Sequence, residues 1–211
     1  MNRVLVVAAA MALATATPLD AQRLVRVGVH SLGLTYTEVS DAAKSEGVGG
    51  AATLQLRWRR FGLEGLVSKA RLKPVNDDEL QEYDIVQVDV RLNFWIAPIV
   101  GLEIGGEWWI IDPAFAAQEI GAGRIGIVSQ YPLARISEIW ARAAYLVNPR
   151  FSGGGEAGLA IDLGLGIGVG TSNGRFRVIA ESNFQRIDRR VNSVEVPLQV
   201  TQARLGVAVG F

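Results

Sequence analysis

Residues 86–96 read VQVDVRLNFWI, and their side chains alternate between two kinds. The even positions are all apolar, whereas the odd positions as far as Asn93 carry Gln, Asp, Arg and Asn. Successive side chains of a β-strand point to opposite faces, whereas a helix would mix the two kinds on one side. The segment therefore predicts a β-strand with one apolar face and one polar face.

The same period of two recurs along the chain and predicts ten strands. They lie at about residues 23–31, 50–60, 61–71, 84–96, 99–111, 120–131, 135–147, 156–170, 174–185 and 199–211. Several approach the ~9–11 residues that a tilted strand needs to cross a bilayer. We expect an all-β fold, an antiparallel up-and-down transmembrane β-barrel. The segment 23–31 is short and glycines interrupt 120–131, so eight strands are the alternative to ten.

The connections between these segments alternate in length. Tight turns are expected at Arg60-Phe61, Ala97-Pro98, Pro132-Leu133 and Thr171-Ser172-Asn173-Gly174. Longer, polar connections are expected at 32–49, 72–83 and 186–198. Transmembrane barrels have short turns on the periplasmic side and longer loops on the outer side. The phase of the alternation places both chain ends on the periplasmic side.

Aromatic residues indicate which face of the sheet meets lipid. They cluster near the strand ends on the apolar face: Trp58, Phe61, Phe94, Tyr131, Phe176 and Phe211 toward the short turns, and Trp108, Tyr145 and Phe184 toward the longer loops. Aromatic girdles of this kind mark membrane interfaces. A soluble barrel also alternates, with its apolar face inward. The opposite face here is rich in glycine and alanine, which suits a crowded lumen, so we predict that the apolar face points outward.

The N-terminus has the pattern of an export signal. A short positive start is followed by an apolar and small stretch from Val4 to Ala16, and Ala21 offers a small residue for cleavage. We expect a signal peptide at 1–21 and a β-barrel domain at 22–211. An uncleaved membrane anchor would need about 20 apolar residues, more than this stretch provides.

The last strand, Ala203 to Phe211, alternates apolar residues with small or polar ones and ends on an aromatic residue. With this ending and the repeated alternation, the chain resembles small bacterial outer-membrane β-barrels of the OmpA-like and OmpX-like kind. The resemblance implies location in the outer membrane and contact with its lipids and lipopolysaccharide. It also implies that the barrel assembly machinery reads the terminal strand; an extracellular partner stays unknown.

Composition excludes several other classes. Lys and Arg total 21 and Asp and Glu total 21, so a net charge of zero gives no reason to expect nucleic acid as a partner. There is no cysteine, which excludes disulfides and thiolate metal sites. We expect no cofactor and no metal site. The acidic run 76–79 could hold a divalent cation, but a solvated loop accounts for it as well.

Each expected strand places at least one ionisable side chain on the inner face. Its ionisable residues are Arg26, Arg57, Arg59, Glu64, Asp89, Arg91, Glu103, Glu107, Arg124, Glu138, Arg142, Asp162, Arg177, Glu181 and Arg204. Buried unpaired charge is costly, so we expect these groups to pair across the lumen. Such a network could be a rigid plug or the lining of a selective pore. The small interior of a barrel this size favours the plug.

Enzymes occur among small outer-membrane barrels as lipid A deacylases, palmitoyl transferases and proteases, which rely on histidine with serine or acidic partners. This chain has one histidine, His30, which we expect near the outer rim. Its neighbour Ser31 points to the opposite face of a strand. Asp77, Asp78 and Asp112 fall in expected loops, and no motif links them to His30. We therefore expect no catalytic residue.

The function expected from these observations is structural or surface contact in the cell envelope. A narrow channel for ions or small solutes is the alternative, and an enzyme acting on lipid A or peptides is third. Lys69, Arg71 and Lys73, near the expected outer rim, could contact lipid phosphates.

Overall fold

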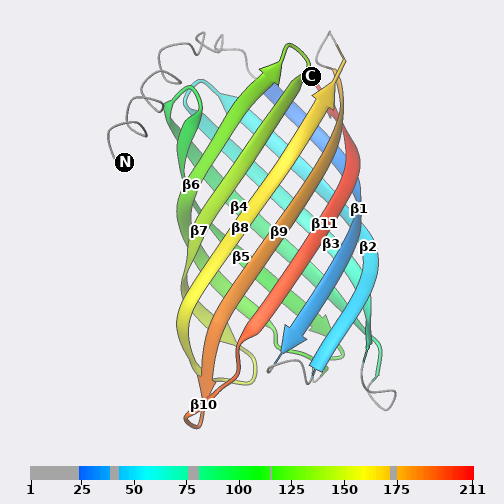
Figure 1. Ribbon diagram of the computed structural model, residues 1–211, viewed down its shortest axis with the longest axis vertical. Helices are drawn as coiled ribbons and strands as arrows, with labels where there is room; N and C mark the ends of the chain where they lie inside the picture. The colour runs from blue at the N-terminus through cyan, green and yellow to red at the C-terminus, as the bar shows by residue number, and fades with distance from the viewer. Residues whose placement is uncertain (1–23, 39–42, 76–80, 115, 172–174) are drawn as a thin grey trace, which may run out of the picture.

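The computed structural model describes residues 24–38, 43–75, 81–114, 116–171 and 175–211. One antiparallel sheet closes on itself as a barrel (Figure 1). Its wall strands are β1 (Leu24–Glu38), β2 (Ala43–Trp58), β3 (Phe61–Pro74), β4 (Tyr83–Ala97), β5 (Val100–Asp112), β6 (Ile120–Ala134), β7 (Ser137–Phe151), β8 (Glu156–Gly170), β9 (Phe176–Val191) and β11 (Leu198–Gly210). The expected signal peptide at 1–21 lies outside the described residues.

Strands that are consecutive in the wall pair with each other, and β1 pairs with β11 to complete it. The two-residue strand β10 (Val194–Glu195) only extends the end of β9. The prediction of an all-β antiparallel barrel with ten wall strands is confirmed, and the eight-stranded alternative is wrong. In the described part of the chain, no helix has the length and apolar character needed to cross a membrane.

One end of the barrel, called here the turn end, carries the tight turns and the described chain ends (Figure 1). Leu24 begins β1 there, and the neighbouring Val25 exchanges backbone hydrogen bonds with Phe211. The turns lie at 59–60, 98–99 and 135–136. The last of them was expected at Pro132-Leu133, but β6 passes through a register shift near Pro132 and continues to Ala134. Of the fourth expected turn, residues 172–174 lie outside the described residues.

At the opposite end, called the loop end, the strands continue farther than expected. β1 runs to Glu38 and β2 begins at Ala43, so the prediction of a long loop at 32–49 is wrong. The expected loop at 186–198 is also wrong over most of its length, because β9 continues to Val191, β10 occupies Val194–Glu195 and β11 begins at Leu198. The barrel wall therefore extends beyond the length that a bilayer requires.

These loops were expected because the apolar residues move from the outer face of the strand to its inner face toward the loop end. In β1, the odd positions from Val25 to Val29 are exposed on the outer wall, whereas the even positions Leu32 and Leu34 are buried inside. Strands β4, β9 and β11 change in the same way. Apolar side chains face outward where lipid surrounds the wall. Nearer the loop end the same kind of residue faces inward.

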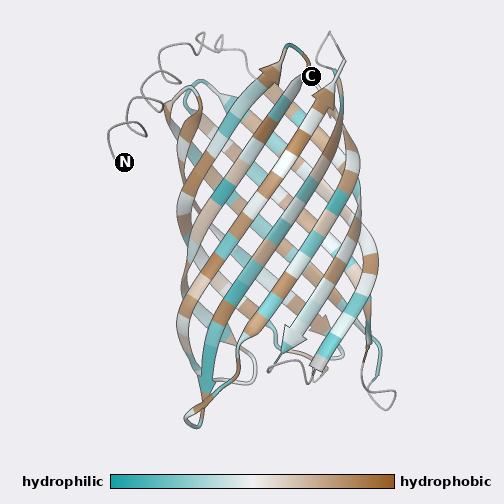
Figure 2. Cartoon of the chain, in the orientation of Figure 1, coloured by the Kyte–Doolittle hydropathy of each residue, from teal (hydrophilic) through white to brown (hydrophobic). Residues whose placement is uncertain are grey.

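Exposed apolar side chains form a band around the outer wall. Figure 2 shows hydrophobic and hydrophilic residues following each other along the strands of this wall. Members of this band from around the barrel include Val67, Val90, Ile104, Ile127, Leu165, Val178 and Val207. Lipid offers the backbone no hydrogen-bond partners, so a wall in lipid must close on itself. The continuous ladder from β1 round to β11 meets this requirement.

Inside the loop-end half of the barrel is a hydrophobic cluster rather than a charged one. Its members are Leu32, Leu34, Tyr36, Ala70, Leu72, Tyr83, Ile85, Trp109, Ile111, Ala117, Ile120, Ala122, Leu146, Ala160, Ile187, Leu198 and Val200. Leu72, Leu146 and Ala160 are fully buried. The prediction that the apolar face points outward is therefore wrong for this half.

A charge placed on the outer wall tests where lipid meets the barrel. Val90 is on the outward face in the middle of β4, so Val90→Arg should lower the free energy of unfolding by about 2–4 kcal/mol. Val48 is exposed near the loop end of β2, where Val48→Arg should cost only about 0–1 kcal/mol. Urea unfolding of the protein in lipid vesicles measures both, and equal costs would contradict the assignment of the lipid-facing band.

Candidate functional site: an ion-paired lumen with a pocket at the turn end

Arg124 projects from β6 into the middle of the lumen, where its guanidinium is surrounded by carboxylates from three other strands. Its nitrogen atoms lie 2.9 Å from Asp89 Oδ2, 3.0 Å from Glu103 Oε1, 3.8 Å from Glu107 Oε2 and 2.5 Å from Asp162 Oδ2. All five side chains are at most 3% exposed. Arg124 is therefore the centre of a fully buried charge cluster.

The register of the sheet brings these groups to one level of the barrel. Asp89 in β4 lies opposite Glu107 in β5, and Gly105 in β5 lies opposite both Arg91 and Arg124. A Cβ on Gly105 would collide with the backbone of β4. The absence of a side chain there lets the strands approach closely between the two arginines.

Further ion pairs surround Arg124, and one of them, between Arg142 in β7 and Glu64 in β3, joins strands that are distant in the sequence. They are Arg91 with Asp89, Arg142 with Glu64, and Arg204 with Glu181. Glu103 lies 3.7 Å from Arg142 as well as close to Arg124, so it bridges two arginines. Neutral amides complete this layer: Gln185 donates to Glu107, and Gln202 donates to Gln87 at 2.7 Å.

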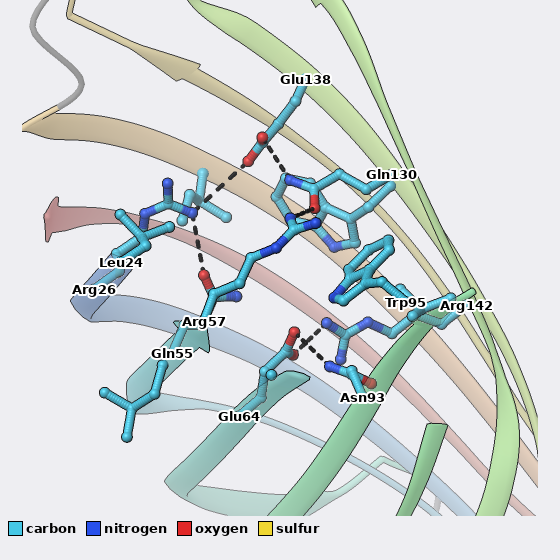
Figure 3. Close-up of a pocket in the computed structure, with 15 residues that line it drawn as sticks. Leu24, Arg26, Gln55, Arg57, Glu64, Asn93, Trp95, Gln130, Glu138 and Arg142 are labelled. Carbon is cyan, nitrogen blue, oxygen red and sulfur yellow. Dashed lines mark hydrogen bonds and ion pairs between the residues drawn. The ribbon is translucent and has the colours of Figure 1, made fainter. Parts of the chain in front are cut away.

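A pocket lies between this network and the turn end, lined by residues of β1, β2, β3, β4, β6, β7 and β9 (Figure 3). Arg26 donates to Gln55 at 3.1 Å and lies 3.8 Å from Glu138. Arg57 donates to Gln130 at 3.2 Å, and Gln130 donates in turn to Glu138 at 2.6 Å. Polar side chains thus form a connected chain across the mouth of the barrel.

The loop end is covered by a different set of contacts. Arg189 in β9 pairs with Glu38 at the end of β1, at 3.2 Å, and donates to the carbonyl of Gly154 at 2.8 Å. The connection between β5 and β6 reaches over the hydrophobic cluster, where Ala117 is buried and the amide of Gln118 donates to the Tyr36 hydroxyl at 3.2 Å. The interior is therefore filled in three layers, apolar at the loop end and charged in the middle and at the turn end.

All but one of the charged residues predicted on the inner face lie there. The structure brings the following residues to the inner face: Arg26, Arg57, Glu64, Asp89, Arg91, Glu103, Glu107, Arg124, Glu138, Arg142, Asp162, Arg177, Glu181 and Arg204. Arg59 instead occupies the turn after β2, with a φ of 54°, and its guanidinium lies over the Trp58 ring. The alternation was extended one position too far there, into a turn.

The contacts of Glu38 and Arg189 were missed because both residues were expected in loops. The only signal for them was the inverted alternation of Leu32, Leu34 and Tyr36, which continues the strand toward Glu38. An alternation whose apolar residues have moved to the other face still predicts a strand. It does not predict which distant carboxylate or arginine a side chain of that strand contacts.

The aromatic residues expected at the membrane interfaces lie on the outer wall. Exposed members are Trp58, Phe61, Phe94, Trp108, Tyr131, Tyr145, Phe176 and Phe211. Phe184 is on the same outward face but half-buried. At the turn end, the rings of Phe61 and Phe94 lie 5.3 Å apart across neighbouring strands.

His30 lies inside the barrel rather than at its rim, because β1 continues beyond it to Glu38. Its Nε2 lies 3.0 Å from the Thr53 hydroxyl. Ser31 points to the outer face and donates to the carbonyl of Leu205. Asp77 and Asp78 lie outside the described residues. Within the described ranges, no group of His and acidic side chains is arranged to hold a metal ion.

Comparison with known proteins identifies the architecture. No protein-family model matches the chain, and no curated protein sequence is significantly similar to it. Among solved structures, the outer membrane protease OmpT from Escherichia coli is similar, with a TM-score of 0.58 and 10% sequence identity over 93% of this chain and 99% of that one.

Two further solved structures align with lower scores. Ail, the attachment invasion locus protein of Yersinia pestis, has a TM-score of 0.44 and 12% identity over 90% of this chain and 99% of Ail. Neisserial surface protein A has a TM-score of 0.41 and 15% identity over 89% of this chain and 97% of that protein. The closed ten-stranded wall, its exposed apolar band and the likeness to OmpT give this chain the fold of a small bacterial outer-membrane β-barrel, located in the outer membrane.

Proposed function

We propose that this protein is a sealed, non-enzymatic barrel with a structural or surface-contact role in the outer membrane. The main support for this proposal is that large, fully buried side chains fill the lumen. Arg124, Glu103 and Leu72 are examples. A diffusion pore needs a continuous water-filled path. Here the charged layer and the hydrophobic cluster lie one after the other along the barrel axis.

The balance of charge in the lumen also supports a plug over a pore. Without Arg59, the inner set contains seven arginines and seven carboxylates, and its central members are paired. A selective pore uses rings of one sign of charge, which attract the permeating ion. Paired charges instead satisfy one another and bind neighbouring strands together.

Two partners are part of this proposal. Lipopolysaccharide is expected at the loop end, where Lys69, Arg71 and Lys73 project from the outer face of β3 and are at least 65% exposed. Asp84 and Glu82 pair with these cations, and lipid phosphates would compete for them. The barrel assembly machinery is expected to recognise β11, which ends beside the exposed Phe211.

Single-channel recording distinguishes a sealed barrel from a channel. The protein in planar lipid bilayers should show no steady open level, because no water-filled path is expected through the two layers. Reproducible open levels would contradict the proposal, particularly if Glu103→Gln changed their ion selectivity. Glu103 lies inside the central cluster, so its charge would act on any ion that passed there.

Removal of the central cation tests whether the network stabilises the barrel. Arg124→Met should lower the free energy of unfolding by about 3–5 kcal/mol, because it leaves several buried carboxylates without their cation. Arg186→Met is the matched control, since Arg186 forms an exposed pair with Asp188, and should cost no more than about 1 kcal/mol. Urea unfolding in vesicles measures both, and a similar small loss in the two variants would argue against the structural role.

Incubation with lipid A tests the absence of enzymatic activity. Mass spectrometry should find the acyl chains unchanged, since Nε2 of His30 contacts a threonine hydroxyl and Nδ1 has no hydrogen-bond partner among the described residues that would orient the ring. An altered lipid A that disappears with His30→Ala would overturn this part of the proposal. Thr53→Val is the companion variant, because it removes the hydroxyl that contacts the ring.

A further inference from the structure

The pocket at the turn end has a surplus of positive charge. Arg26, Arg57 and Arg142 line it, whereas Glu138, one of its two carboxylates, lies 3.8 Å from Arg26 and also pairs with Arg177. The other acidic side chain of the lining, Glu64, is already engaged by Arg142. The described part of the mouth therefore presents more guanidinium groups than carboxylates.

Among the arginines that line the pocket, Arg57 is the one with no acidic partner in the described part of the chain. Among the described residues, no carboxylate lies within ion-pair distance of its guanidinium, which contacts the amide oxygen of Gln130 and lies 4.3 Å from the centre of the Trp95 ring (Figure 3). These two contacts fix the plane of the guanidinium at the edge of a cavity of about 60 Å³. A half-buried charge held in this way is stabilised by an anion.

The rest of the lining suits a ligand that also has an apolar part. Leu24, Leu56, Val128 and Ile179 line the same cavity beside the Trp95 and Trp140 rings. A water molecule needs at least about 10–15 Å³ of such volume. The cavity therefore has room for one small anionic group, with apolar side chains next to it.

We propose that this pocket binds a carboxylate carried on a small apolar group, such as the C-terminal residue of a peptide or a free acid of similar size. The planar guanidinium of Arg57 matches the two oxygens of a carboxylate, and Arg26 lies on the same lining to share its charge. The ligand would reach the site from the turn end, where the pocket lies between strand ends next to the tight turns.

Calorimetric titration of the purified barrel in detergent micelles tests this site. N-acetyl-leucine should bind saturably, whereas N-acetyl-leucinamide, which has the same apolar group without the charge, should not. Arg57→Gln should weaken binding by about tenfold or more, because hydrogen bonds to a charged partner are lost. Arg57→Lys keeps the charge but not the planar pair of donors. The affinity of this variant for N-acetyl-leucine should therefore lie between that of the unchanged protein and that of Arg57→Gln.

Controls separate loss of the site from loss of the fold. Arg186→Gln alters an exposed arginine on another part of the barrel and should leave binding unchanged. Urea unfolding shows whether each variant is folded; if Arg57→Gln is not, Arg26→Gln provides the same test from the neighbouring strand.

Two further ligands identify the source of the carboxylate. A short peptide ending in leucine that binds at least as tightly as N-acetyl-leucine indicates a chain end, and binding of the free acid alone indicates a small solute. Equal binding of the amide, tighter binding of inorganic phosphate, or full affinity in folded Arg57→Gln would overturn the proposal.

Discussion

The absence of hydrogen-bond partners in lipid is the constraint on which the rest of this structure depends. Every backbone group in the membrane must find a partner within the sheet, so the wall closes through the pairing of β1 with β11. Closure then forces alternate side chains into a narrow interior. Charged groups placed there can neither reach water nor remain unpaired at acceptable cost, and the cluster around Arg124 is the result.

The change of apolar phase along the strands divides the barrel into two parts. Where lipid surrounds the wall, valines such as Val27 face outward and polar groups such as His30 face inward. Beyond that level, Leu34 faces inward and Thr35 faces outward. The loop-end half therefore has a hydrophobic interior and a polar exterior, as in a soluble barrel. One wall combines both arrangements, because the solvent outside changes from lipid to water along its length.

The positions that were predicted wrongly have physical explanations. The strand from Leu32 to Glu38 was expected as a loop, since its apolar residues lie on the opposite face from those of Val25 to Val29. Arg59 was expected in the lumen because the alternation continues to it, but the chain reverses direction there. Both errors arise where the surroundings of the chain change: the first expected strand stops too early there, and the second continues too far.

The sequence by itself determined the class of fold and the inward face of the membrane-spanning part, because both follow from a period of two. It favoured ten strands and left eight as the alternative. It also supplied the charged residues of the lumen. Only the tertiary structure decided which of them meet: that Arg124 contacts carboxylates of three other strands, and that Arg57 is left with Gln130 and Trp95. Contacts across a lumen depend on barrel closure and strand register, which no single strand encodes.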